Sequence, residues 1–389
     1  MRMVSAIASQ EEPGRIIGEL TQQLRQGLEG DPADLLLLFV STALQKHFGG
    51  ITGQIGRQLG ARSMLACTAE SVLGGGREIE RQAAVSAMAI SLPGVTIGPF
   101  RFAEEEWPEL MGEGKALRAR LETGPDLRLL LMFGDPFTTP VVQLLDACSR
   151  EFPHAPIVGG MASGMMRPGE TRLAIGDNIF SSGLIGVSFA GPLEVDCVVS
   201  QGCRPIGKTF IITRGHDNII EELDHEPALR TLRKMIDQLP PADRDLMEQR
   251  GLQIGRVIDE RKGNFGRGDF LVRNILGIHR PSHGLSIGDM VQSGQIVQFQ
   301  VQDARTANED LRLLLEGELL LSNAPRGALM FSCNGRGTHL FQTPNHDIQA
   351  LGDILGPIPV AGFFCAGELG PVGGRNFIHG QTVSLALFR

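Results

Sequence analysis

Short apolar runs recur along the chain, and stretches with helical spacing lie between them. The runs Leu35–Val40, Leu127–Phe133 and Gly327–Phe331 have the length of a buried strand. Each is followed about 30 residues later by a second apolar segment that leads into a loop of small residues. Between the two segments of each pair lies a stretch whose apolar residues have helical spacing. These stretches are residues 53–59, 141–152 and 348–355. A strand, a helix and a second strand form a crossover unit, so the pattern predicts an α/β fold.

The second segments resemble one another in sequence. At an ungapped offset of 298 residues, a cysteine, a glutamate and a glycine pair near the N-terminus fall on the same residue types near the C-terminus. The matched positions are Cys67 with Cys365, Glu70 with Glu368, and 75–77 with 373–375. A weaker third copy, 156–164, has Ser163 near the cysteine position and no matching glutamate. Chance similarity between glycine-rich strand ends is the alternative, but we interpret the match as internal repetition.

The length of the chain favours two domains, because 389 residues exceed one ordinary hydrophobic core. The regular strand pattern breaks at Gln201–Gly207, which predicts domains at 1–206 and 207–389. In the second half, residues 208–213 and 294–302 are predicted strands and Pro227–Leu239 is a predicted helix. The predicted class is mixed α/β, with layered mixed β-sheets flanked by helices and two halves related by internal duplication.

Composition excludes several classes of partner. Hydrophobic residues make up 42% and charged residues 21%, which is typical of a folded globular protein. A net charge of −8, no basic run, one Trp and no Tyr argue against nucleic acid as a partner. No stretch is long enough to span a membrane, and the N-terminus lacks a signal-peptide layout. The six cysteines form no CxxC pair, so we expect a cytoplasmic protein with reduced thiols.

The loop after the predicted strand Gly327–Phe331 is the first candidate for chemistry. It reads Cys333-Asn334-Gly335-Arg336-Gly337. Glycines let backbone N–H groups approach a ligand, and Arg336 can hold a carboxylate by two parallel hydrogen bonds. The structural alternative is that the glycines serve a tight turn and that Arg336 pairs with Glu368. On the first interpretation, Arg336→Ala is expected to abolish ligand binding and to leave the fold intact.

A second candidate group lies at the end of the last copy of the repeat. Cys365, Gly367 and Glu368 follow one another there, and we include all three in the expected ligand site. Glu368 can hold an amine of the ligand or position Arg336. It can equally cap a helix or satisfy buried N–H groups.

Two further kinds of chemistry remain open as alternatives. Cys333 or Cys365 can act as a nucleophile if a histidine nearby serves as the base, as in a Cys-dependent hydrolase or transferase. The histidines available in the same segment are also the candidates for haem ligation; they are His339, His346 and His379. We expect no metal, because the chain has no pair of recognised metal-ligand spacing. The glycine run at 74–76 lacks the spacing of a phosphate-binding loop.

Several motifs together resemble the FIST family, with its N-terminal and C-terminal parts in tandem along essentially the whole chain. The clearest are Cys333–Gly337, Gly362–Glu368 and the run His379-Gly380-Gln381-Thr382. Looser matches precede them, at Gln201–Gly207, Ile220–Asp224, Pro227–Leu229, Phe270–Ile275 and Asp303–Leu311.

The resemblance implies a sensory module that binds a small ligand, for which amino acids are proposed in the family. One branch of the family is associated with haem and nitric oxide. With no output domain evident in the sequence, the resemblance implies a signalling protein that acts in trans. We therefore expect a cytoplasmic sensor of a small ligand, an amino acid or a similar small carboxylate, without a resident cofactor. A haem-based nitric oxide sensor and a cysteine-dependent enzyme are the alternatives.

Overall fold

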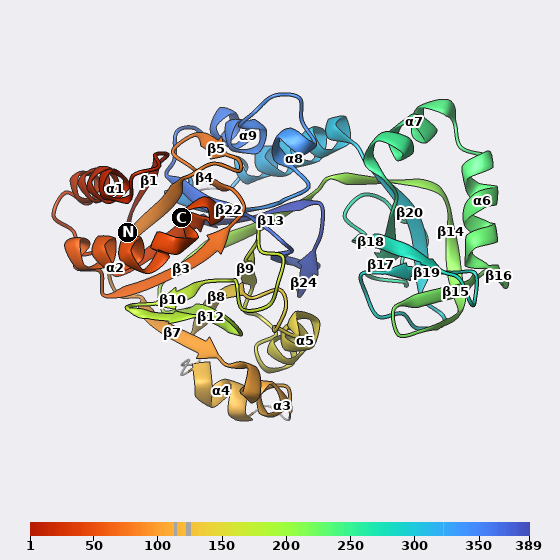
Figure 1. Cartoon of the computed structure of the whole chain (residues 1–389), viewed down its shortest axis with the longest axis horizontal. Helices are drawn as coiled ribbons and strands as arrows, with labels where there is room; N and C mark the ends of the chain where they lie inside the picture. The colour runs from red at the N-terminus through yellow and green to blue at the C-terminus, as the bar shows by residue number, and fades with distance from the viewer. Residues whose placement is uncertain (113–114, 122–125, 322) are drawn as a thin grey trace. The chain divides into compact units, whose positions relative to one another are not determined.

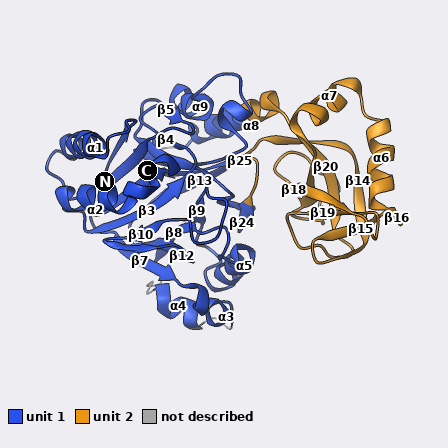
Figure 2. Cartoon of the chain, viewed as in Figure 1, with its two compact units in different colours: residues 1–199, 311–378, 382–389 blue, residues 200–310, 379–381 orange. Residues whose placement is uncertain are grey.

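The computed structural model describes residues 1–112, 115–121, 126–321 and 323–389. They form two compact units, drawn in different colours in Figure 2. Unit 1 comprises residues 1–199, 311–378 and 382–389, and unit 2 comprises 200–310 and 379–381. The predicted boundary at residue 206 lies near the start of unit 2. The chain returns to unit 1 at residue 311, because unit 2 is an insertion and not a C-terminal half.

Unit 1 contains three six-stranded mixed sheets, which Figure 1 shows with their helices. The first has the order β1 (Arg2–Ala8), β6 (Val85–Ser91), β2 (Leu35–Ser41), β3 (Ser63–Ala69), β10 (Leu173–Ile175), β11 (Asn178–Phe180). The second has the order β7 (Thr96–Phe102), β12 (Leu184–Ala190), β8 (Leu127–Gly134), β9 (Ile157–Met161), β23 (Glu368–Val372), β24 (Arg375–His379). The third has the order β13 (Val195–Gln201), β25 (Thr382–Phe388), β21 (Gly327–Cys333), β22 (Val360–Cys365), β4 (Val72–Gly74), β5 (Arg77–Ile79).

The three sheets are built on one plan. Each has a central parallel pair, β2 with β3, β8 with β9, and β21 with β22. We call the chain segments that supply these pairs repeats one, two and three. The mixed α/β class and the internal repetition are confirmed, and the repeated unit occurs three times within unit 1.

The outer hairpin of each sheet comes from a different repeat. The hairpin β4–β5 follows β3 in the chain but pairs with β22 of repeat three. Hairpin β10–β11 of repeat two pairs with β3, and β23 of repeat three pairs with β9. The repeats are therefore interlocked, and residues of repeat one lie against the end of repeat three.

Strand register corrects the alignment of the cysteines. Ser86 and Ser384, which match at the offset of 298, lie opposite Phe39 and Phe331. Cys67 also lies opposite Phe39, whereas Cys365 lies opposite Cys333, two residues beyond Phe331. Cys67 and Cys365 are thus not equivalent, and the repeat match holds for the hairpin turn and the strand after it. The two copies differ by two residues between the strand and the hairpin, which an ungapped alignment does not allow for.

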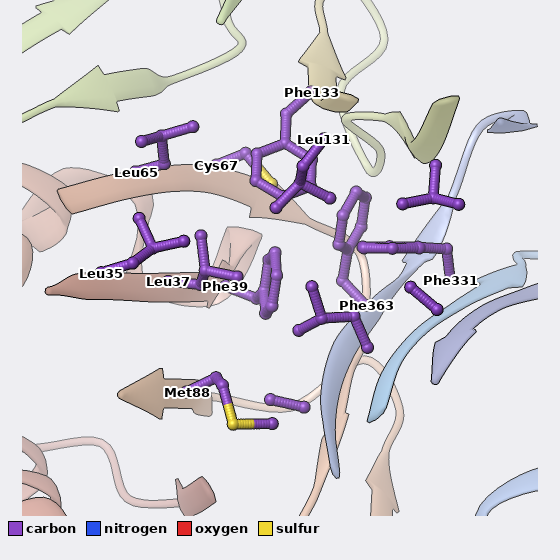
Figure 3. Close-up of a cluster of buried hydrophobic side chains, with 14 of the residues drawn as sticks. Leu35, Leu37, Phe39, Leu65, Cys67, Met88, Leu131, Phe133, Phe331 and Phe363 are labelled. Atoms are coloured by element: carbon purple, nitrogen blue, oxygen red, sulfur yellow. The ribbon is translucent and has the colours of Figure 1, made fainter. Parts of the chain in front are cut away.

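The inner faces of the sheets share one core. Phe39, Phe133, Phe331 and Phe363 meet there from β2, β8, β21 and β22, as Figure 3 shows. The Phe39 and Phe133 rings are 5.4 Å apart in an edge-to-face arrangement, and those of Phe331 and Phe363 are 5.6 Å apart. The central strands are buried on both faces, which explains why their sequences are continuous apolar runs.

Helices cover the outer faces of the sheets. Those of repeat one are α1 (Pro13–Leu28) and α2 (Phe48–Leu59), preceded by the 3₁₀ helix η1 (Thr42–His47). Those of repeat two are η2 (Glu104–Glu106), α3 (Trp107–Leu110), α4 (Lys115–Leu121) and α5 (Val141–Glu151). Repeat three has η3 (Gly337–His339), α9 (His346–Leu355) and the end of α8 (Ala304–Glu318). No helix in the described ranges is long and apolar enough to cross a membrane.

Unit 2 has a different architecture. Its strands form one antiparallel sheet in the order β14 (Cys203–His216), β20 (Ile296–Gln302), β17 (Gln253–Val257), β18 (Phe270–His279), β19 (Gly284–Ile287), β15 (Ile219–Leu223), β16 (Glu226–Pro227). Two further helices, α6 (Ala228–Asp237) and α7 (Pro241–Arg250), belong to this unit. The predicted helix Pro227–Leu239 and the predicted strands at 208–213 and 294–302 are confirmed.

Candidate functional site

The candidate site lies where the central parallel strands of repeat three end. Cys333 is the last residue of β21 and Cys365 the last of β22, and the two are register partners. The carboxyl ends of parallel strands meet at one edge of a sheet, and the loops that follow them gather there. The loop after Cys333 and the turn after Cys365 therefore lie together, next to hairpin β4–β5 from repeat one.

A buried ion pair is the centre of this site. The Arg336 Nε and Nη2 atoms donate hydrogen bonds to the two carboxylate oxygens of Asp347, at 2.7 and 2.8 Å. The side chains of Arg336 and Asp347 are 0% and 1% exposed. Burial works against both charges, but attraction and hydrogen bonds between them prevail, so the pKa of Asp347 lies below its usual range. The same forces raise the pKa of Arg336.

The carboxylate of Asp347 has two other donors beside it. The Ser332 hydroxyl lies 3.2 Å from its Oδ2 atom, and the His346 Nδ1 atom lies 3.0 Å from its Oδ1 atom. Arg336 therefore does not pair with Glu368, as the structural alternative proposed, but with a residue at the start of α9.

Glu78 reaches the site from repeat one. Its Oε1 atom accepts hydrogen bonds from the backbone N–H groups of Asp347 and Ile348, both at 3.0 Å. These groups belong to the first turn of α9, where N–H groups have no partner within the helix. Burial, followed by the negative charge of Asp347, raises the pKa of Glu78 to about 8.

Glu368 supplies a third acid, from the first position of β23. Its side chain is completely buried, and its Oε2 atom accepts hydrogen bonds from the backbone and hydroxyl of Thr382, at 3.3 and 2.7 Å. Burial raises the pKa of Glu368 to about 8, against the effect of Thr382, a hydrogen bond from Cys333 and the charge of Arg336. Near neutral pH this side chain is therefore mostly protonated.

Four buried side-chain atoms at this place have no hydrogen-bond partner among the described residues. They are Arg336 Nη1, Glu78 Oε2, Glu368 Oε1 and Asn334 Oδ1. Buried polar atoms in folded proteins nearly always have partners, so four exceptions in one place require an explanation. Arg336 lies close enough to influence the pKa of Glu368, and the charge of Glu78 influences Arg336 in turn. We call Glu78, Asn334, Arg336 and Glu368 the polar cluster. It offers one cationic donor, one amide oxygen that accepts, and two carboxyl oxygens that donate when protonated and accept when ionised.

The predicted glycines allow the backbone of the site to adopt positive φ angles and to approach neighbouring groups closely. Gly337 has φ +56°, and a Cβ atom there would lie 2.8 Å from the carboxylate of Glu80. That carboxylate accepts hydrogen bonds from the backbone and hydroxyl of Thr338, at 2.9 and 2.7 Å. Gly367 has φ +140°, and a Cβ atom there would lie 2.7 Å from Ile378. The Gly335 N–H group donates to the Cys333 sulfur at 3.4 Å. No larger residue fits at 337 or 367 without strain.

The two cysteines differ in accessibility. Cys365 is completely buried, its thiol points to the Phe363 carbonyl at 3.7 Å, and burial raises its pKa well above the usual value. A thiol that stays protonated in an apolar core is a poor nucleophile. Cys333 is partly exposed and donates to Glu368.

The three histidines lie in different surroundings. The His346 ring is stacked on Phe341 with centroids 3.4 Å apart, and it stands beside the carboxylate of Asp347. His339 is exposed on η3, and His379 belongs to unit 2. Haem needs apolar walls on both faces and an axial ligand. The buried charges around His346 do not fit that requirement, and we assign no role to haem.

Three members of this site were not found from the sequence. Glu78 is remote in sequence and arrives only because its hairpin joins another repeat. Asp347 immediately precedes the predicted helix at 348–355, and an acid in the first turn of a helix was a usable signal. Asn334 lay within the recognised loop, but its sequence gives no sign that its oxygen lacks a partner.

Comparison with protein-family models assigns the chain to a family. The model of the FIST N domain matches residues 34–226, and the model of the FIST C domain matches residues 228–371. This protein belongs to the FIST family. FIST domains are sensory domains that bind small ligands. The division between the two models, at residue 227, falls within unit 2, so the family regions differ from the compact units.

The names of proteins with similar sequences do not indicate a biochemical activity. Two uncharacterized proteins, one of Mycobacterium tuberculosis and one of Mycobacterium bovis, are each 37% identical to this FIST protein over 391 residues. The match covers 100% of this chain and at least 99% of each relative. A solved structure of cyanuric acid hydrolase matches 100% of this chain and 99% of its own, with 11% identity and a TM-score of 0.33. This last similarity is too weak to support an argument.

Proposed function

We propose that this FIST protein is a sensor that binds a small molecule carrying both a carboxylate and an amine, an amino acid or a close analogue, at the polar cluster. The observation that carries the proposal is the set of four buried atoms without partners. One is a cationic N–H group, one is an amide oxygen that accepts, and two are carboxyl oxygens that accept in the ionised form. An amino acid offers the complementary set, because its carboxylate accepts and its ammonium group donates three hydrogen bonds.

Three of the four residues of the polar cluster have distinct parts in this proposal. Arg336 is held by Asp347 through two of its nitrogen atoms, which leaves Nη1 to donate to the carboxylate of the ligand. Glu368 Oε1 and Asn334 Oδ1 accept from the ammonium group. The pair with Asp347 fixes the direction of the guanidinium group, so that little conformational freedom remains to be lost on binding.

Proton release is a consequence of this arrangement. Glu368 has a pKa of about 8 and is mostly protonated at pH 7. An ammonium group beside it favours the carboxylate form and lowers its pKa. Binding at pH 7 should therefore release a fraction of one proton per chain.

Access to the cluster runs through the loop after β21. Arg336 and Glu368 are completely buried, whereas Asn334 and Gly335 are partly exposed and Thr338 is exposed. A ligand that reaches Nη1 must displace part of this loop, so binding and a local change of the surface are coupled. A coupling of this kind is what a sensory domain needs in order to report its ligand.

A thermal-shift screen tests the proposal. Full-length protein is heated with each amino acid, with the corresponding carboxylic acid without the amine, and with the corresponding amine without the carboxylate. A ligand at one hundred times its dissociation constant adds about 2.7 kcal/mol to the free energy of unfolding, which is visible as a raised Tm. We expect at least one amino acid to raise Tm more than either of its two half-analogues.

Glu368→Gln is the matched variant for this screen. Glutamine resembles the protonated glutamic acid in shape and retains an acceptor for Thr382, so the fold should persist. It cannot become the carboxylate that the ammonium group favours, and the Tm shift should shrink. An equal shift in Glu368→Gln, or no shift with any amino acid, contradicts the proposal.

The proposal extends to a signalling protein that acts in trans and to a cytoplasmic location. The support is the family membership together with the six cysteines, which form no disulfide bond with one another in the described residues, as in a reducing compartment. A pull-down with purified protein tests the partner: the amount of a captured protein should change when the amino acid from the screen is added.

A further inference from the structure

Unit 2 contains a cavity of about 570 Å³ between α6 and the strands β14 and β15. Cavities of this volume are typical of small-molecule sites. The polar cluster lies in unit 1, so the cavity has no part in the function proposed above. Figure 2 shows unit 2 with α6 as one of its helices.

An irregularity in β14 forms one wall of the cavity. Strand β14 pairs regularly with β20 up to Pro205 and again from Thr209, and the register shifts between these two residues. Gly207 lies in this bulge with φ +64°, and a Cβ atom there would lie 2.9 Å from Met235 Cγ on α6. The bulge therefore approaches the helix closely beside the cavity, and glycine is required for the approach.

The floor of the cavity is apolar and its rim is charged. Buried side chains form the floor; they are Phe210, Leu223, Met235 and Leu239. Two exposed lysines stand at the rim, where Lys208 pairs with Asp224 at 2.8 Å and Lys234 pairs with Glu226 at 2.7 Å. Each ammonium group has three N–H donors, so both lysines retain donors for another anion.

A buried hydroxyl lines the cavity without a partner. Thr231 is 7% exposed, and its Oγ1 atom has no hydrogen-bond partner among the described residues. It lies one helical turn before Lys234 and Met235 on α6, so all three face the cavity. A buried hydroxyl without a partner costs free energy, and a ligand that bonds to it removes that cost.

We propose that this cavity binds a small, mainly apolar molecule with one anionic head group, such as an aromatic carboxylate or sulfonate. The apolar body rests on Phe210, Leu223, Met235 and Leu239. The head group accepts hydrogen bonds from the Thr231 hydroxyl and from the ammonium group of Lys234 on α6, and Lys208 on β14 adds a second positive charge. The site is separate from the polar cluster, and either site can exist without the other.

Two fluorescent probes test this site in the full-length protein. The anion 8-anilinonaphthalene-1-sulfonate has the proposed chemistry, and N-phenyl-1-naphthylamine is nearly the same body without the charge. We expect the anion to bind saturably, with one molecule per chain, and more tightly than the neutral probe. In the double variant Lys208→Gln/Lys234→Gln, affinity for the anion should fall about tenfold, as for loss of a charge-assisted hydrogen bond, while affinity for the neutral probe stays the same.

Two single variants complete the test. Thr231→Val removes only the hydroxyl, leaves no bonded partner behind, and should weaken binding of the anion several-fold without lowering Tm. Leu320→Ser controls for binding to exposed leucines elsewhere, because Leu320 follows α8 and is 88% exposed. Loss of the signal in Leu320→Ser, or equal affinity for the anion in the wild type and the double lysine variant, overturns the proposal.

Discussion

Repeats two and three place different polar groups on the same scaffold. Asp135 and Cys333 lie two residues beyond the equivalent phenylalanines Phe133 and Phe331. Asp135 directly follows β8, and Cys333 is the last residue of β21. In repeat two, the carboxylate of Asp135 accepts hydrogen bonds from the hydroxyls of Thr171 and Thr138, at 2.6 and 2.7 Å. No buried side-chain oxygen of Asp135, Thr138 or Thr171 lacks a hydrogen-bond partner.

In repeat three, by contrast, several buried polar atoms lack a hydrogen-bond partner among the described residues. Its loop and the elements around it leave Arg336 Nη1, Glu368 Oε1, Asn334 Oδ1 and Glu78 Oε2 without partners among the described residues. In repeat one the equivalent residue is Ser41, whose hydroxyl accepts from the Ala84 N–H group at 2.9 Å. Two copies of the scaffold thus close their strand ends with complete hydrogen bonding, and one copy does not. This difference supports the proposal that the ligand site lies at the end of repeat three.

The largest effect is expected from breaking the buried pair of repeat three. Arg336→Leu leaves the carboxylate of Asp347 buried without its cation and should lower the free energy of unfolding by about 3–5 kcal/mol. This prediction differs from the expectation drawn from the sequence, in which Arg336→Ala leaves the fold intact, because the guanidinium group lies in a buried pair. Asp135→Asn in repeat two keeps the shape and an acceptor, and should cost about 1–3 kcal/mol. Urea denaturation of both variants measures the difference.

The double variant Arg336→Leu/Asp347→Leu is the control for this prediction. It removes both charges together and should recover most of the lost stability, because the main cost of the single change is an unpaired buried carboxylate. Arg15→Ala changes an exposed ion pair with Glu12. If Arg336→Leu and Arg15→Ala were equally stable, the pair between Arg336 and Asp347 could not be a buried one.

A smaller effect concerns the pH dependence of stability. Glu78 and Glu368 have pKa values near 8 in the folded protein, against 4.5 as the ordinary value. Between these values the folded protein binds more protons than the unfolded chain, so stability falls as pH rises from about 5 to 8. One such carboxyl contributes a slope of at most about 1.4 kcal/mol per pH unit. Glu368→Gln should make the slope shallower, while Glu11→Gln, at an exposed site, should not.

At acidic pH, stability is expected to change in the opposite direction and to fall as pH falls. Asp347 has a lowered pKa in the folded protein, so its contribution is present above its ordinary value of 3.8 and is lost as pH falls below it. Stability measured by urea denaturation should therefore pass through a maximum near pH 5. A profile that rises steadily from pH 5 to pH 8 would contradict the assignment of both raised carboxyls.

The smallest effect concerns the thiols. Cys333 is partly exposed, whereas burial raises the pKa of Cys67, Cys148, Cys197 and Cys365. Iodoacetamide at neutral pH should label Cys333 before those four, as followed by mass spectrometry of peptides. Faster labelling of Cys365 would favour the cysteine-dependent enzyme and would contradict the buried environment of its thiol.

The sequence predicts local features of this protein well and long-range features poorly. The strands 35–40, 127–133 and 327–331 and the loop with Arg336 were found because apolar runs and glycines act within a few residues. The partner of Arg336 and the arrival of Glu78 depend on strand exchange between repeats, which periodicity does not record. The insertion of unit 2 was missed for the same reason, since the return of the chain to unit 1 is a property of contacts.

The central claim is that the polar cluster of repeat three is completed by a ligand. A crystal structure of the protein, grown with the amino acid that raises Tm most, tests this directly. The account predicts the carboxylate of the ligand within hydrogen-bond distance of Arg336 Nη1 and its ammonium group beside Glu368 Oε1. Ordered water molecules alone on these four atoms, in crystals saturated with that amino acid, would contradict it.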